Sequence, residues 1–146
     1  DIYLSYSPMD GLTVGAGRMD SDAPKSAGVN SNTYEWVSHA VYSTGPIKLG
    51  IRVGQSDPGT QGTPTSDIMG YSVAFNVNEN FAISWGQQEV EKDSGANAVT
   101  EEVTGISAAY TVGAASVRFH RSEANNAAHV KSTDDEHMEL GVVLAF

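Results

Sequence analysis

Three short acidic clusters are the first candidates for chemistry in this chain of 146 residues, because carboxylates bind divalent cations. They lie at residues 20–22, 89–93 and 134–137, the last of which ends in His137. None has the fixed ligand positions and central glycine of a calcium-binding EF-hand loop. We therefore interpret them as solvated acidic segments and expect no metal site.

Histidine and serine side chains could instead carry catalysis. The sequence holds four histidines, at positions 39, 120, 129 and 137, but no HExxH, no GxSxG and no glycine-rich phosphate loop. A serine–histidine pair such as Ser122 with His120 remains open, although nothing singles it out. We expect no catalytic residue, no cofactor and no enzyme activity.

Basic and imidazole side chains occupy polar positions of several alternating segments: Lys48, Arg52, Arg118, His120 and His39. Lys48 and Arg52 are four residues apart, which in a strand places them on one face about 13 Å from each other. On the wall of a water-filled pore, such side chains would concentrate anions and steer charged solutes. Ordinary solvated charges that hold loops or partners are the equal alternative.

The segments that position these side chains alternate apolar and polar residues, the pattern of β-strands with two different faces. At the C-terminus, positions 138, 140, 142, 144 and 146 are large and apolar, whereas the positions between them are polar or small. Nine segments show this alternation: residues 2–7, 12–19, 34–43, 46–55, 67–77, 81–88, 103–112, 115–122 and 137–146. The register of residues 34–43 is ambiguous, and we place Glu35 and His39 on its polar face.

The connections between these segments alternate in length, and the long ones carry the charge. Four short connections hold turn-forming Gly, Pro, Asn and Asp, and four long ones span residues 20–33, 55–67, 88–102 and 122–136. The long connections contain 13 acidic and 3 basic residues, which accounts for the whole formal charge of −10. This acidity argues against a nucleic-acid partner.

The absence of cysteine excludes disulfides, and no apolar run approaches the roughly 20 residues of a membrane-spanning helix.

Aromatic residues gather on the apolar faces, toward the strand ends. We assign nine of them to two aromatic girdles at a membrane surface: Tyr6, Tyr34, Trp36, Tyr42, Phe75, Phe81, Trp85, Tyr110 and Phe146. The opposite faces are mostly Gly, Ser and Ala, unlike the charged outer face of a soluble β-sandwich. We therefore predict an all-β fold, an antiparallel transmembrane β-barrel of about nine strands here. A soluble β-sandwich binding module is the weaker alternative.

The odd number of strands bears on whether the chain forms a whole barrel. Single-chain bacterial barrels usually have an even number of strands with both termini on the short-turn side. Nine strands that end on that side place Asp1 on the long-loop side. We therefore expect residues 1–146 to be one barrel segment without a second domain, incomplete at its N-terminal side. If the whole barrel has 16 strands, it is the C-terminal portion.

Arg18 and Arg121 fall on the apolar face near the long connections. They could bind lipopolysaccharide phosphates, or their long side chains could extend toward the membrane surface, which we favour slightly.

The last eight residues, 139–146, resemble the terminal strand of Gram-negative outer-membrane proteins. The hairpins at residues 41–50 and 109–117 are similar to those of general porins, especially alphaproteobacterial ones. The resemblance implies a homotrimer of 16-stranded barrels in the outer membrane. Each barrel would hold a water-filled channel for passive diffusion of small hydrophilic solutes and ions. It also implies contact with membrane lipid and lipopolysaccharide, and recognition of the strand ending in Phe146 by the barrel-assembly machinery. The infolded loop that narrows such pores has no match in this sequence.

A second function fits the same barrel. The long loops could make it a surface anchor or recognition platform for lipopolysaccharide, phage or partner proteins. Deletion of residues 122–136 distinguishes the two functions, because a platform would lose its partner whereas a channel would still conduct.

Overall fold

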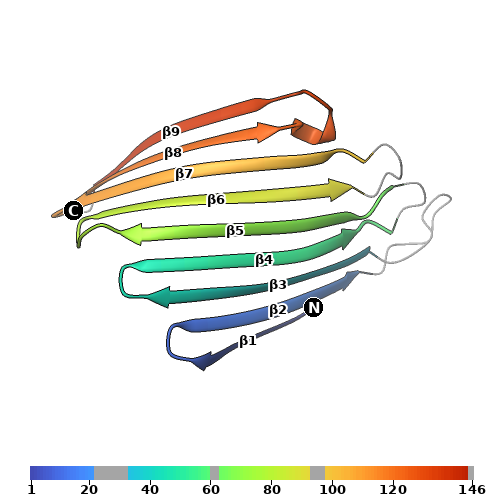
Figure 1. The fold of residues 1–146 in the computed structure, drawn as a ribbon, viewed down its shortest axis with the longest axis horizontal. Helices are drawn as coiled ribbons and strands as arrows, with labels where there is room; N and C mark the ends of the chain where they lie inside the picture. Colours follow the sequence, from blue (N-terminus) through green and yellow to red (C-terminus); the bar gives the residue numbers. More distant parts are fainter. Residues whose placement is uncertain (22–32, 60–62, 93–97, 145–146) are drawn as a thin grey trace.

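A computed structural model describes residues 1–21, 33–59, 63–92 and 98–144 of the chain. It contains a single antiparallel sheet in which each strand pairs with its sequence neighbours (Figure 1). The strands are β1 (Ile2–Met9), β2 (Leu12–Ser21), β3 (Thr33–Thr44), β4 (Ile47–Asp57), β5 (Ser66–Asn76), β6 (Phe81–Lys92), β7 (Thr100–Val112), β8 (Ala115–Asn125) and β9 (Asp135–Leu144). One short 3-10 turn, η2 (Ala127–His129), lies between β8 and β9. The prediction of nine antiparallel strands is confirmed.

The short hairpins all lie at one end of the sheet, as the alternating connection lengths predicted (Figure 1). Gly11, Gly45 and Gly113 adopt left-handed φ angles of 78°, 52° and 57°, which suit glycine because it has no Cβ. Between β5 and β6, the Asn78 side chain accepts hydrogen bonds from the backbone N–H groups of Asn80 and Phe81, both at 2.9 Å. These tight turns fix the register of the hairpins that they join.

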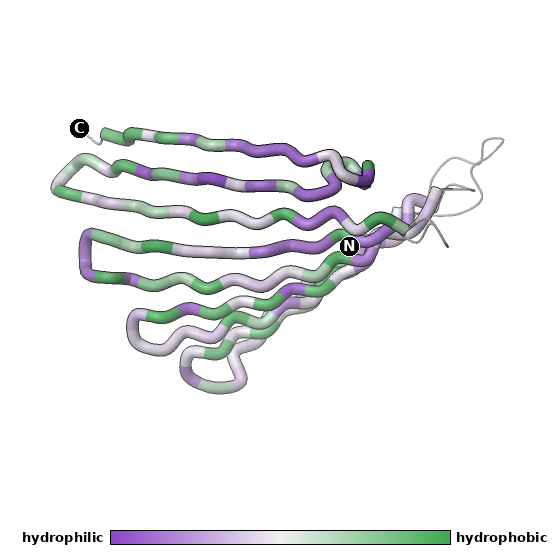
Figure 2. The backbone as a smooth tube through the Cα atoms, turned by 45° about the horizontal axis from the view of Figure 1, so that its top comes forward, coloured by the Kyte–Doolittle hydropathy of each residue, from purple (hydrophilic) through white to green (hydrophobic). Residues whose placement is uncertain are grey.

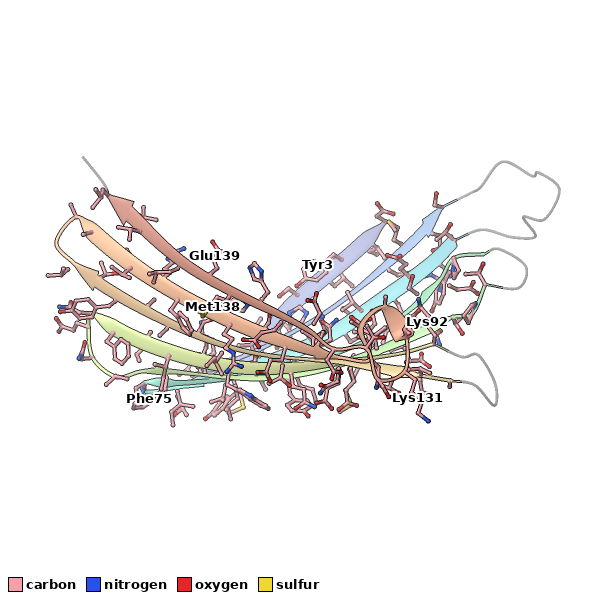
Figure 3. The ribbon with its side chains drawn as sticks, turned by 90° about the horizontal axis from the view of Figure 1, so that it is seen from above. Tyr3, Phe75, Lys92, Lys131, Met138 and Glu139 are labelled. Carbon is pink, nitrogen blue, oxygen red and sulfur yellow. The ribbon has the colours of Figure 1, made fainter. Side chains whose placement is uncertain are left out.

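The register separates the side chains into two faces. Along β4 and β5, Leu49 lies opposite Val73 and Ile51 opposite Tyr71, whereas Gly50 lies opposite Ser72 on the other face. The sheet is strongly curved, and the apolar side chains such as Phe75 project from its convex side (Figure 3). Tyr3 and Glu139 project from the concave side (Figure 3). The register chosen for residues 34–43 is confirmed, because Trp36 pairs with Gln55 on the convex face and His39 with Arg52 on the concave face.

The sheet has no core of its own. Within the described ranges, no hydrophobic side chain is buried, and Leu49 and Ile51 are 46% and 47% exposed. No second sheet covers the convex face in this part of the chain, which a soluble β-sandwich would require. In the described residues, no helix has the length and apolar character needed to cross a membrane.

The strands extend further toward the long connections than the sequence predicted. β6 continues to Lys92 and β7 begins at Thr100, so Glu89 and Glu102 pair within the ladder. The prediction that these carboxylates lie in loops is therefore wrong. Ladder hydrogen bonds join backbone groups, so pairing continues where the side chains are no longer apolar. Figure 2 shows the strands becoming more hydrophilic toward this end.

We expect a lysine on the convex face to destabilise the folded protein far more than one on the concave face. Ile51→Lys should lower the free energy of unfolding by about 2–4 kcal/mol, because the predicted transmembrane barrel places this side chain in hydrocarbon. Ser72→Lys, one strand away on the concave face, should cost less than about 1 kcal/mol. Urea unfolding of the full-length protein in lipid vesicles measures both, and equal losses would contradict the assignment of the faces.

Candidate functional site

A row of polar side chains crosses the middle of the concave face. His39 on β3 lies directly opposite Arg52 on β4, and Arg52 lies opposite Gly70 on β5, which in turn lies opposite Gln88 on β6. The Arg52 guanidinium donates a hydrogen bond to the Gln88 side-chain oxygen. Arg52 thus reaches over Gly70 of β5 to the second strand along. This row lines a groove of about 540 Å³ that extends to His120 on β8.

His39 also contacts Tyr3, on the side opposite Arg52. Its ring stacks on Tyr3 of β1, with centroids 6.1 Å apart and planes inclined by 10°, and the Tyr3 hydroxyl lies 3.4 Å from His39 Nε2. Gly15 of β2 lies between them, where a Cβ atom would approach His39 Cε1 to 2.5 Å and the Tyr3 hydroxyl to 2.7 Å. Glycine at this position therefore lets the two rings meet above β2.

The other predicted residues also lie on the concave face, and Lys48 and Arg118 are nearer the short hairpins than Arg52 is. Lys48 pairs in register with Ala74, and Arg118 with Ala109 and Gly141. His120 Nδ1 lies 2.9 Å from Ser107 Oγ on β7. The serine that pairs with His120 is therefore Ser107 and not Ser122, the pairing that the sequence left open. His120 lies two residues from Ser122 along β8, but directly opposite Ser107.

Cations on the two faces differ in their partners. On the convex face, Arg18 binds Asp20 through two hydrogen bonds of 2.8 and 2.9 Å, and its guanidinium lies 4.6 Å from the centre of the Tyr34 ring. Arg121 binds Glu136 at 2.8 Å and also Glu123. These pairs are exposed to solvent, so they contribute little to the stability of the fold.

On the concave face, no carboxylate of the described residues lies within 4.0 Å of the Lys48, Arg52 or Arg118 cation. Within the described part of the chain, no carboxylate therefore neutralises these three cations. The structure brings His39 and Arg52 together on neighbouring strands, whereas Arg118 and His120 lie four strands away on β8.

The aromatic residues assigned to girdles lie on the convex face where the structure describes them. Tyr6, Tyr42, Phe75, Phe81 and Tyr110 lie toward the short hairpins, and Tyr34 and Trp36 lie toward the long connections. Trp85 lies four residues after Phe81, the first residue of β6, and the centre of its ring is 5.6 Å from the centre of the Tyr71 ring. Phe146 lies outside the described residues.

Sequence reasoning missed the neutral partners Gln88, Ser107 and Tyr3. Period-2 alternation gives the face of a residue but not its cross-strand neighbour, which depends on register. One signal was present: Tyr3 is the one aromatic residue of twelve that the alternation places off the apolar face.

A family model for Gram-negative porins matches residues 1–146. A search of curated proteins finds no match. Among solved structures, a porin refined at 1.8 Å resolution is similar with a TM-score of 0.75 and 16% identity, over 96% of this chain and 49% of that one. OmpT of Vibrio cholerae, expressed in the outer membrane, has a TM-score of 0.69 and 12% identity, over 97% and 54% of the two chains. The chain thus spans about half the length of these structures, and at such identities the likeness shows the fold alone.

We expect Gly15→Ala to displace the Tyr3–His39 pair and lower stability by about 1–3 kcal/mol, as overpacking does elsewhere. Gly141→Ala is the matched control, because a Cβ atom at this concave-face position of β9 meets nothing within 4 Å. Urea unfolding of both variants measures the difference. If Gly15→Ala is as stable as the control, the close approach of the two rings over β2 is contradicted.

Proposed function

Because the chain belongs to the Gram-negative porin family, we propose that it forms part of the wall of a water-filled channel for small hydrophilic solutes and ions. The family places the chain in the bacterial outer membrane. The observation that supports the channel is the contrast between the faces of one sheet. The convex face presents exposed apolar side chains such as Leu49 and Ile51, which suit lipid. The concave face presents Gly, Ser and cations without a carboxylate partner among the described residues, all of which suit water.

The proposed mechanism is passive diffusion with selection by width and wall charge. Small residues such as Gly50, Ser72 and Gly86 project little from the concave wall. We assign the pore-lining role to Lys48, Arg52, Arg118, His120 and His39. Without carboxylate partners in the described residues, the three permanent cations raise the local concentration of anions at the wall.

Completion of the barrel is a further part of the proposal. In the described residues, β1 and β9 form opposite edges of the sheet and do not pair with each other. Hydrocarbon offers no partner for the backbone groups of an open edge, so both edges need further strands. We propose that the chain is one segment of a 16-stranded barrel of the alphaproteobacterial type. The match to about half the length of two solved structures supports a partial barrel, and we assign it the C-terminal portion because residues 139–146 resemble the terminal strand of outer-membrane proteins.

The proposed partners follow from the family and the location. They are membrane lipid, lipopolysaccharide, two further copies in a homotrimer, and the assembly machinery acting on the strand that ends in Phe146. Arg18 and Arg121 already bind carboxylates of this chain, so we assign them to the membrane surface rather than to lipopolysaccharide phosphates.

We expect the purified full-length protein to give discrete conductance steps in planar bilayers. Arg52→Gln should shift the reversal potential in a salt gradient toward cation selectivity, because it removes a fixed positive charge from the pore wall. Arg18→Gln changes the same charge on the convex face and should leave selectivity unaltered. A folded protein without conductance steps would contradict the channel, and equal shifts in both variants would contradict the assignment of the pore wall.

A further inference from the structure

A groove of about 490 Å³ crosses the concave face from β6 to β9, toward the short hairpins. Small residues form its middle, where Ala82 of β6 lies opposite Ala109 of β7. Ala109 in turn lies opposite Arg118 of β8, and Arg118 lies opposite Gly141 of β9. A Cβ atom on Gly141 would meet nothing within 4 Å, so the space beside Arg118 is open.

The groove carries one cation and one carboxylate that do not bind each other. Arg118 and Glu139 both line it, and both residues are exposed. The Arg118 guanidinium makes no hydrogen bond, ion pair or ring contact with another described side chain. Glu139 projects from the concave side of the sheet (Figure 3), and its one ion-pair partner among the described residues is His137, at 3.9 Å. Both charges therefore remain open to a solute in this part of the chain.

The register places the two charges at diagonal positions of neighbouring strands. Glu139 lies directly opposite His120, which is two residues along β8 from Arg118. Diagonal positions of this kind are about 7–8 Å apart. A solute that joins them needs a negative group for Arg118 and a positive group for Glu139, only a few bonds apart. The zwitterion of an amino acid has both, because its carboxylate and its ammonium group are attached to the same carbon.

Electrostatics at this groove favours a zwitterion over either ion alone. The Arg118 guanidinium can donate paired hydrogen bonds to a carboxylate, whose planar shape it matches. The Glu139 carboxylate can accept hydrogen bonds from an ammonium group, which has three donors. A simple anion at Arg118 would be repelled by Glu139, and a simple cation at Glu139 would be repelled by Arg118. A solute with both charges makes both contacts, because each of its charges lies nearer the residue of opposite sign.

We infer that Arg118 and Glu139 form a binding site in the channel wall for zwitterionic amino acids. The inference rests on the proposed channel function and adds a solute class to it. Either residue alone would select solutes by the sign of their charge, whereas the pair selects a dipole in one orientation. Weak, reversible binding at the wall slows each amino acid but raises its concentration in the pore.

The test compares glycine with two ions that each carry half of it, acetate and methylammonium. Saturation-transfer NMR on the purified full-length protein in detergent micelles, at pH 8 and low ionic strength, gives a dissociation constant for each solute. Histidine side chains are ordinarily neutral at this pH, and low salt leaves the charges unscreened. We expect saturable binding of glycine. Acetate and methylammonium should bind roughly tenfold more weakly, because each lacks one charged hydrogen bond.

Substitutions at the two residues test the pairing of charges. Arg118→Gln and Glu139→Gln should each raise the dissociation constant for glycine by roughly tenfold, through loss of a charged hydrogen bond. The double variant Arg118→Glu with Glu139→Arg should restore it to within about threefold of the parent protein, because the zwitterion then binds in the opposite orientation.

Arg52→Gln and Glu35→Gln are the matched controls, because they remove a concave-face cation from β4 and a concave-face carboxylate from β3, away from the groove. Neither should change the dissociation constant for glycine by more than about twofold, since distant sites act independently.

Equal affinity for acetate and glycine, or no recovery of binding in a folded charge-exchanged variant, would overturn the zwitterion site. The site is likewise overturned if Arg118→Gln and Arg52→Gln weaken glycine binding equally, or if another part of the full-length protein covers the groove and glycine does not bind. Conductance steps from the same preparation separate the site from the channel. A conducting protein that does not bind glycine refutes the site and leaves the channel intact. A protein that binds glycine with the expected variant pattern but never conducts supports the site and refutes the channel.

Discussion

Backbone hydrogen bonding in lipid is the constraint on which the rest of this structure depends. Hydrocarbon offers no partner to an unpaired N–H or C=O group, so the chain must satisfy these groups within the sheet. In the described residues, nine strands pair in sequence order, joined on one side by tight turns such as Asp10–Gly11, and only β1 and β9 have an unpaired edge. Once pairing is fixed, side chains alternate between two environments, and the sequence need only match each position to lipid or water.

Side chains on the concave face make contacts between strands that do not pair with each other. Arg52 of β4 reaches over Gly70 of β5 to hydrogen-bond Gln88 of β6. Gly15 of β2 lets the Tyr3 and His39 rings meet, because a Cβ atom there would approach His39 Cε1 to 2.5 Å and the Tyr3 hydroxyl to 2.7 Å. A small residue on this face therefore leaves room for its larger neighbours to meet.

Much of the fold could be predicted from the sequence, because alternation of apolar and polar residues reports directly on the face of each side chain. The placement of Lys48 and Ile51 on opposite faces is an example, and so is the exceptional position of Tyr3. The ends of β6 and β7 could not be predicted, because ladder bonds continue through Glu89 and Glu102 without apolar side chains. The Arg52–Gln88 bond could not be predicted either, since it depends on the registers of β4, β5 and β6.

The central claim is that the concave face meets water and the convex face meets lipid. Because the sequence contains no cysteine, single cysteines can be placed at residues 47 to 53 of β4 and probed in outer membranes. A charged, water-soluble thiol reagent should modify cysteines at positions 48, 50 and 52 and leave those at 47, 49, 51 and 53 unmodified. Uniform modification along β4, or the opposite alternation, would contradict the account.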